Sequence, residues 1–131
     1  MSRWKTSSTA IFNLSYHLIW CPKYRRPVLT EDVQLRMREL LQEKALELGI
    51  EIVEANILPD HVHLFVKTKP IHSPQFVVGQ LKGYTSRMLR QEFPKLKSRL
   101  PTLWTRSYYI DSVGILNEHT IRKYVQDQKN K

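Results

Sequence analysis

Residues 57–66, Ile-Leu-Pro-Asp-His-Val-His-Leu-Phe-Val, constrain the fold of this chain more than any other segment. The part that follows the Pro-Asp turn signal predicts a strand, in which successive side chains point to opposite faces. Val62, Leu64 and Val66 of that strand then face a core, while His61 and His63 share the other face at a spacing that suits one metal ion. Two histidines on one strand face are as often surface residues as ligands, so the pair needs support from elsewhere in the chain.

Hydrophobic periodicity predicts the elements around this strand. They are a strand over 11–20, a helix over 31–48, a hairpin of strands over 50–58 and 61–68, a helix from Pro74 to about Glu92, a strand over 103–112 and a short final helix that carries Tyr124. Thr30 and Ser73 are expected to cap the two long helices, and Gly49 to end the first one. Residues 95–99 are expected to form a basic loop, and Gly79 with Gly83 would permit close backbone approach.

The order of these elements is strand, helix, strand, strand, helix, strand, and then an appended helix. It predicts an α+β fold of the ferredoxin-like, split βαβ kind, with an antiparallel sheet in a single domain spanning residues 1–131. The helices are expected to cover one face of the sheet and to leave the histidine face for chemistry. His17 is expected on the polar, wetter face of the first strand as a plain surface residue, and the turn alone explains Asp60.

The charge favours a polyanionic partner. Twenty-one Lys and Arg against twelve Asp and Glu give a net charge of +9 on 131 residues, which points above all to nucleic acid, although a merely solvated basic surface is the plainer alternative. The candidate DNA contacts are Lys23, Arg25, Arg26, Lys82, Arg87 and Arg90. A lone cysteine, the lack of an apolar run long enough for a membrane and a polar N-terminus predict a cytoplasmic protein.

Tyr124 and Gln128 lie four residues apart and are therefore neighbours on one face of the final helix. Taken alone, Tyr124 would be interpreted as a residue that packs on the apolar side of the helix, and Gln128 as a solvated residue of a fraying last turn. Their occurrence together with the histidine pair favours a site made of a nucleophile, a third polar ligand and a two-histidine chelate.

Five sequence segments together resemble the HUH single-tyrosine transposases, the small TnpA-like enzymes of hairpin-ended insertion sequences. They are Tyr16-His-Leu-Ile-Trp-Cys-Pro-Lys-Tyr-Arg25, Pro59-Asp-His-Val-His-Leu64, Gln80-Leu-Lys-Gly83, Trp104-Thr-Arg-Ser-Tyr-Tyr109 with Ser112-Val-Gly114, and Tyr124-Val-Gln-Asp-Gln128. The resemblance covers nearly the whole chain. It implies that Tyr124 is the nucleophile and that His61, His63 and Gln128 hold a metal ion.

The resemblance further implies cleavage and rejoining of single-stranded DNA with hairpin ends through a 5′-phosphotyrosine. It also implies a homodimer in which Tyr124 of one subunit serves the histidines of the other, although the sequence leaves a site within one subunit open. Two imidazoles and an amide oxygen carry no negative charge, so metal binding should be weak before DNA phosphate arrives. Mg²⁺ or Mn²⁺ suits such a site, and Zn²⁺ or Co²⁺ could be accepted.

Three other functions remain open. A non-catalytic ferredoxin-like nucleic-acid-binding module would explain fold and charge but leave the histidines and Tyr124 as coincidence. An HUH nickase or replication initiator would use the same chemistry, but proteins of that kind are longer chains with added domains. A metal-dependent hydrolase of small molecules is disfavoured by the basic surface.

Overall fold

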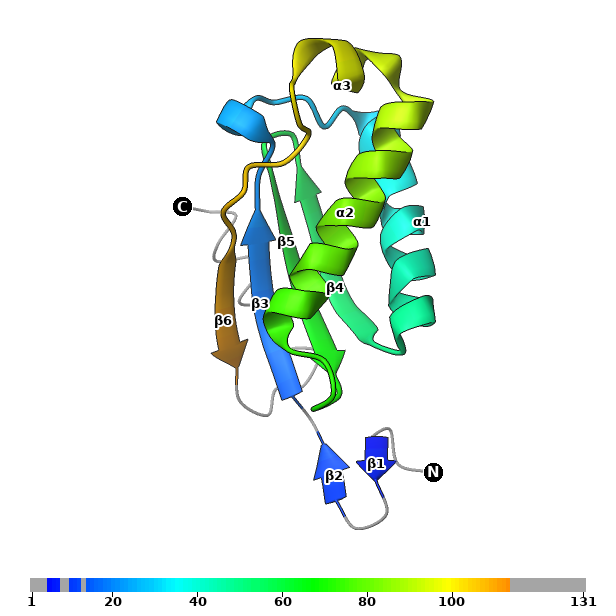
Figure 1. Ribbon diagram of the computed structural model, residues 1–131, viewed down its shortest axis with the longest axis vertical. Helices are drawn as coiled ribbons and strands as arrows, with labels where there is room; N and C mark the ends of the chain where they lie inside the picture. Colours follow the sequence, from blue (N-terminus) through cyan, green and yellow to red (C-terminus); the bar gives the residue numbers. More distant parts are fainter. Residues whose placement is uncertain (1–4, 8–9, 13, 114–131) are drawn as a thin grey trace.

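The computed structural model describes residues 5–7, 10–12 and 14–113 (Figure 1). A four-stranded antiparallel sheet has the order β4-β5-β3-β6, and a small separate sheet pairs β1 with β2. The strands are β1 (Lys5–Ser7), β2 (Ala10–Phe12), β3 (Leu14–Trp20), β4 (Glu51–Leu58), β5 (His61–Thr68) and β6 (Tyr109–Val113). The helices are α1 (Glu31–Leu48), α2 (Pro74–Glu92) and α3 (Pro94–Arg99), with a 3₁₀ turn, η1 (Lys23–Arg25).

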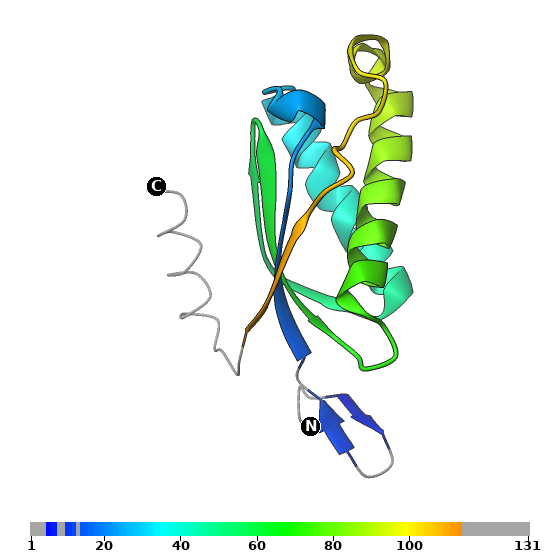
Figure 2. The same ribbon diagram turned by 60° about the vertical axis from the view of Figure 1, so that its left-hand side comes forward.

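This arrangement confirms the predicted α+β, ferredoxin-like topology. The chain runs β3, α1, β4, β5, α2, β6, and the first and third strands of that series pair at the centre of the sheet. Helices α1 and α2 lie side by side over one face of the sheet (Figures 1 and 2). The expected helix with Tyr124 and Gln128 lies outside the described residues.

The hydrophobic core lies between that sheet face and the two helices. Val62, Leu64 and Val66 of β5 are buried there, as their alternation predicts. The largest fully buried side chains of the core include Trp20, Leu18, Met37, Leu40, Leu41, Leu81 and Leu89. Burial of so much apolar area is the main favourable term that holds the sheet and helices together.

Helix α1 begins and ends where the sequence predicts. Thr30 is the N-cap residue, although its hydroxyl donates to the Asp32 carboxylate instead of accepting a backbone N–H. Gly49 ends the helix in a left-handed conformation with φ +72°, and its N–H donates to carbonyls of the last turn. This left-handed conformation favours glycine at position 49, whereas the Lys69 ammonium group that a side chain there would meet can move aside.

Helix α2 also begins as predicted, because the Ser73 hydroxyl accepts the Phe76 N–H at 3.0 Å and Pro74 occupies the first turn. Its two glycines do not mediate close packing. Among the described residues, no heavy atom outside the helix's own backbone lies within 4 Å of a Cβ built at Gly79 or Gly83, so that expectation is wrong.

Strand β4 contains a bulge that decides which of its side chains face the histidines. Ile52 pairs with Val66, whereas Glu54 pairs with Phe65, so one extra residue, Val53, is accommodated in β4. Beyond the bulge Asn56 pairs directly with His63. Because paired residues of an antiparallel ladder share a face, Asn56 lies on the histidine side of the sheet.

Two predicted element boundaries are wrong. The strand expected over 103–112 begins only at Tyr109, because residues 103–108 form a connection that meets the chain through an isolated bridge between Trp104 and Pro22. The basic segment 95–99 belongs to α3 instead of a loop, because Pro94 starts a short helix there.

The first predicted strand, 11–20, is divided. Leu14–Trp20 joins the main sheet as β3, while Ala10–Phe12 belongs to the separate sheet. No helix of the described part of the chain is long and apolar enough to cross a membrane.

Candidate active site

His61 and His63 lie on one face of β5, opposite the helices. Their ring centroids are 4.7 Å apart and the rings meet edge to face. The His61 side chain is 22% exposed, whereas His63 is buried. The predicted two-histidine arrangement is therefore present, with one imidazole open to solvent and one enclosed.

A carboxylate holds the exposed imidazole. His61 Nδ1 donates a hydrogen bond of 2.7 Å to Asp60 Oδ1, and Arg25 Nε donates to Asp60 Oδ2 at 3.1 Å. The hydrogen bond from His61, with help from Arg25, lowers the pKa of Asp60 below its usual value. Because an ionised carboxylate only accepts, the proton of His61 stays on Nδ1 and the Nε2 lone pair is left for a ligand.

The turn that supplies Arg25 has an uncommon backbone. Tyr24 and Arg25 both have positive φ, 59° and 51°. Such a conformation costs a residue with a side chain of order 1–3 kcal/mol and persists only where the surroundings hold it. Lys23 N–H, which donates to the Leu103 carbonyl at 2.8 Å, and Arg25 N–H, which donates to Pro22 at 2.7 Å, are two of those restraints.

A second histidine, His17, holds the buried imidazole. His17 Nε2 and His63 Nδ1 are hydrogen bonded at 3.2 Å, and the His17 ring stacks on Phe65 with centroids 4.6 Å apart and nearly parallel planes. A neutral His63 that offers Nε2 to a metal carries its proton on Nδ1 and donates it to His17. His17 is fully buried, so the expectation of a surface histidine on a wet strand face is wrong.

Burial keeps both enclosed imidazoles neutral. Desolvation lowers the pKa of His17 to about 4, partly opposed by Asp111 on the neighbouring strand. Desolvation also lowers the pKa of His63 to about 4, and His61 and His17 add to that effect. Neutral imidazole is the form that binds metal, so the environment prepares His63 for coordination near neutral pH.

Other strands complete the surroundings of the pair. Asn56 lies directly across from His63 on β4 and is buried, and its side-chain Nδ2 has no hydrogen-bond partner among the described residues. On the far side, the Tyr109 ring meets His17 edge-on at 6.3 Å. The histidine face is thus enclosed over its centre and open at the Asp60–His61 end.

The residues fit a divalent metal in part. Two neutral imidazoles with fixed second nitrogens are suitable donors. The described residues contain no cluster of three His, Cys, Asp or Glu that could hold an ion, and Asp60 is already engaged with His61. The other predicted members of the site, Gln128 and Tyr124, lie outside the described residues.

The candidate DNA contacts divide into two groups. Three basic side chains are tied to the protein itself: Lys82 Nζ donates to the carbonyls of Thr105, Arg106 and Ser107 at 2.7–3.4 Å, Arg90 donates to Leu100, and Arg25 pairs with Asp60. Lys23 and Arg26 flank the Tyr24 ring at 5.6 and 5.7 Å, and Arg87 lies over Tyr84.

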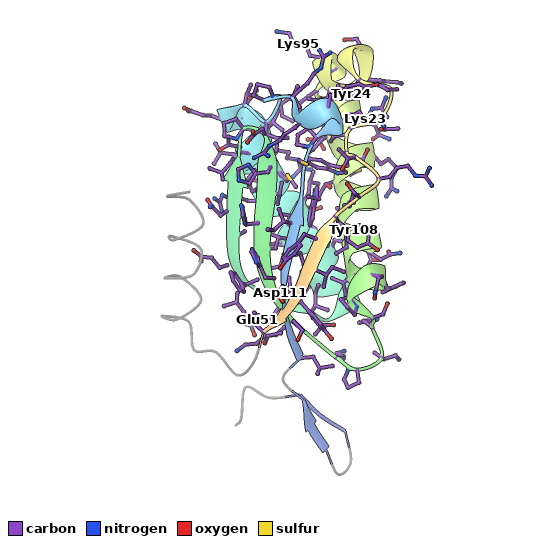
Figure 3. All side chains as sticks on the ribbon, turned by 90° about the vertical axis from the view of Figure 1, so that its left-hand side faces the viewer. Lys23, Tyr24, Glu51, Lys95, Tyr108 and Asp111 are labelled. Carbon is purple, nitrogen blue, oxygen red and sulfur yellow. The ribbon has the colours of Figure 1, made fainter. Side chains whose placement is uncertain are left out.

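These side chains lie in different places. Arg87, Arg90, Ser86, Gly83, Gln91 and Lys97 line a shallow pocket on α2 and α3. Lys23 and Tyr24 lie toward the end of the molecule that also carries Lys95, and Asp111 and Glu51 lie toward the other end (Figure 3).

The sequence analysis gave other roles to three residues of the site: His17 as a surface residue, Asp60 as a turn residue and Arg25 as a DNA contact. The position of Asp60 next to His61 was an available signal, because metal-binding histidines commonly donate their second N–H to a carboxylate. The contacts of His17 and Arg25 depend on strand register and on the left-handed turn, which the pattern of residues does not show.

The chain belongs to the IS200-like transposase family, whose family model matches residues 10–128. It is 36% identical to ISDra2 transposase TnpA of Deinococcus radiodurans over 92% of this chain and 88% of that protein. A crystal structure from D. radiodurans R1, assigned as a transposase, has 34% identity and a TM-score of 0.78 over 95% of this chain and 97% of that one.

A REP-associated tyrosine transposase bound to a REP hairpin shares the fold at 14% identity. The TM-score is 0.60, over 93% of this chain and 68% of that one. Family membership identifies the chain as a transposase and confirms the resemblance found in its sequence.

Proposed function

We propose that this transposase cleaves and rejoins single-stranded DNA at the ends of an insertion sequence, with Tyr124 as the nucleophile. The observation that carries the proposal is the pair His61 and His63, each fixed through its second ring nitrogen by Asp60 or His17. Such a pair, in a chain of the IS200-like family, is an arrangement that grips a phosphate through a metal ion.

In the proposed step the Tyr124 hydroxyl oxygen attacks the scissile phosphorus and the bond from phosphorus to the 3′ oxygen breaks. Tyrosine loses its proton, the departing 3′ oxygen gains one, and the 5′ phosphate remains as a tyrosine ester. A 3′-OH can reverse the step on the same or another strand. The ester conserves the energy of the phosphodiester, so rejoining needs no ATP.

His61, His63 and Gln128 would hold the metal, with Mg²⁺ or Mn²⁺ proposed. When bound, such an ion supplies Lewis-acid polarisation of the phosphate and stabilises charge as it develops. The protein's own part is to orient both imidazoles, which Asp60, Arg25 and His17 do through the hydrogen bonds described above, and to keep His63 neutral through burial.

The proposed substrate is a DNA strand with a folded hairpin and unpaired flanks. The net charge of +9 favours such a partner, and a solved transposase of the same fold is bound to a REP hairpin. Lys23, Arg26 and Arg87 are the better candidates for phosphate contacts, because Lys82, Arg90 and Arg25 already bind groups of the protein.

The test is covalent capture. Wild-type protein incubated with end oligonucleotides and Mg²⁺ or Mn²⁺ should give a protein–DNA adduct on a denaturing gel, and Tyr124→Phe should give none. An adduct that still forms with Tyr124→Phe, or undiminished cleavage by metal-stripped protein in EDTA, would reject the nucleophile or the metal. Competition between hairpin ends and scrambled single strands at fixed salt tests whether the protein prefers the hairpin, and equal affinity for both would reject that preference.

We further propose a homodimer with Tyr124 of one subunit acting at the histidines of the other. Heterodimers of a Tyr124→Phe subunit with a His61→Ala, His63→Ala subunit decide between the two arrangements. A shared site leaves one intact site in each heterodimer and therefore measurable cleavage. Inactive, verified heterodimers would reject the shared site, and a DNA-bound monomer would reject the dimer.

A further inference from the structure

Tyr24 is an exposed aromatic residue in a costly backbone conformation. Its ring belongs to a side chain that is 65% exposed, although its φ of 59° is one that glycine or asparagine adopts more readily. Packing does not explain this cost, because the exposed ring contributes nothing to the core. Strain of this kind gathers at sites of function, and here the observation suggests that the ring is displayed for a ligand.

Cations flank that ring. Lys23 Nζ and Arg26 Cζ lie 5.6 and 5.7 Å from its centroid, near the outer limit of about 6 Å for a cation–π contact. Contacts this long are weak, Arg26 is exposed and Lys23 is half-buried, so both cations can turn toward neighbouring phosphates and leave the ring for a base. An aromatic ring with basic side chains beside it is a pattern by which proteins bind unpaired nucleic acid, with bases on the ring and phosphates on the cations.

The turn that carries the ring is also connected to the histidines. The next residue, Arg25, is ion-paired with Asp60, which in turn accepts from His61. The same turn is hydrogen bonded to Leu103. A base held on Tyr24 is therefore held at a set place beside the open end of the candidate active site.

We propose that Tyr24 is a stacking platform for one unpaired nucleobase of the DNA strand next to the scissile phosphate. Lys23 and Arg26 bind the phosphates on either side of that nucleotide. The inference rests on the proposed function, and it adds a residue that positions the single strand on His61 and His63. Stacking is tolerant of base identity, so Tyr24 sets where the strand lies and does not read its sequence.

Tyr108 offers a matched control. It is also an exposed tyrosine, 42% exposed, with a cation, Lys82, 5.4 Å from its ring. Lys82 is held by three backbone carbonyls. Tyr108 does not have the positive φ of Tyr24, and within residues 14–113 its side chain forms no hydrogen bond or ion pair with Asp60 or His61. A general effect of exposed tyrosines would involve both residues, whereas the proposed platform involves Tyr24 alone.

The experiment places 2-aminopurine at each unpaired position of an end oligonucleotide and follows its fluorescence on binding to the full chain. The same proteins are assayed for the KM and kcat of adduct formation and for thermal unfolding. The variants are Tyr24→Gly, Tyr24→Trp and Tyr108→Ala. Tyr24→Gly removes the ring while suiting the left-handed backbone, so its unfolding temperature should not fall.

We expect Tyr24→Gly to abolish quenching at one position near the cleavage site and to raise KM about 5- to 100-fold, the effect of losing one base–aromatic stack. Its kcat should change much less. Tyr24→Trp should keep the quenching and Tyr108→Ala should behave as wild type. Wild-type quenching and KM in Tyr24→Gly, or equal losses in Tyr24→Gly and Tyr108→Ala, would overturn the platform while adduct formation by the wild type still stands. A wild type that forms no adduct would instead reject the proposed function.

Discussion

His61 and His63 lie two residues apart on the same strand, yet they are held by different means. His61 stands at the open end of the sheet, where a charged carboxylate and an arginine fix its ring. His63 is buried, and a neutral imidazole and packing fix it. The comparison shows two ways to orient a histidine that is to bind a metal ion. His61 is held by charged groups, whose effect solvent and salt weaken, and His63 is held by burial, which protonation at low pH can disturb.

The largest effect is expected when each imidazole is removed in turn. His61→Ala and His63→Ala should each lower DNA cleavage about 1,000-fold, because the phosphate loses several kcal/mol of charge stabilisation. DNA affinity should fall much less, since the basic surface supplies most of it. Adduct formation and filter binding measure the two effects, and equal losses of both would contradict a catalytic role.

The pH dependence of the free energy of unfolding should show that His17 and His63 are buried as neutral imidazoles. In the unfolded chain His17 and His63 titrate near 6.5, whereas in the folded protein their pKa is lowered to about 4. The unfolded state therefore binds more protons between these values. The free energy of unfolding is therefore highest above about pH 6.5. It falls as the pH drops toward 4, by about 3 kcal/mol for each imidazole.

Urea unfolding of the metal-free protein between pH 4 and 7 measures this loss. His17→Phe should remove the share of His17, since phenylalanine does not titrate. The lowered pKa of Asp60 acts in a separate window, because its contribution is lost only below the usual carboxyl range near pH 4. A flat unfolding midpoint from pH 7 to 4 would contradict neutral, buried imidazoles.

A smaller effect is expected when the hydrogen-bond partner of each histidine is removed. Asp60→Ala and His17→Phe should each weaken Mn²⁺ binding about 10-fold, as loss of a hydrogen bond to a metal-binding histidine typically does. His17→Phe keeps an aromatic ring against Phe65 and so limits the damage to packing. Titration of Mn²⁺ by electron paramagnetic resonance gives the affinity, and Asp60→Asn, which keeps an acceptor, should fall between Asp60→Ala and wild type.

The smallest effect is expected at Arg25. Its ion pair with Asp60 involves a side chain that is 65% exposed, so Arg25→Ala should weaken Mn²⁺ binding only about 3-fold, and less at high salt. The same salt series on His17→Phe should show little change, since that contact is buried. A salt response that is the same in both variants would remove the distinction between the two anchors.

The sequence predicts the parts of this molecule that follow from local pattern. Periodicity gives α1, β4, β5 and α2, and turn chemistry gives their ends at Gly49 and Ser73, because these signals act over a few neighbouring residues. The pairing of His61 with His63 also follows from strand alternation. The roles of Tyr124 as nucleophile and of Gln128 as third ligand remain predictions that rest on the family resemblance.

The features that the sequence did not predict depend on contacts between distant segments. His17 reads as a polar residue of an edge face and becomes buried because β3 lies between β5 and β6. Lys82 reads as part of a free basic face, but the 103–108 connection brings three carbonyls to its ammonium group. Both outcomes follow from strand order, which periodicity leaves open.

The bulge at Val53 absorbs one residue of β4 and separates the alternation of its first part from that of the part beside the histidines. Up to Ile52 the even-numbered residues face the helices, and from Ala55 onward the odd-numbered ones do. Deletion of Val53 would therefore remove the bulge and leave Asn56 and Ile57 on their present faces, because both halves of β4 would then follow one regular alternation against β5. Sequences of this strand that differ by a single insertion or deletion should therefore be compared from its His63 end, because the residues bordering that histidine are counted from the hairpin and not from α1.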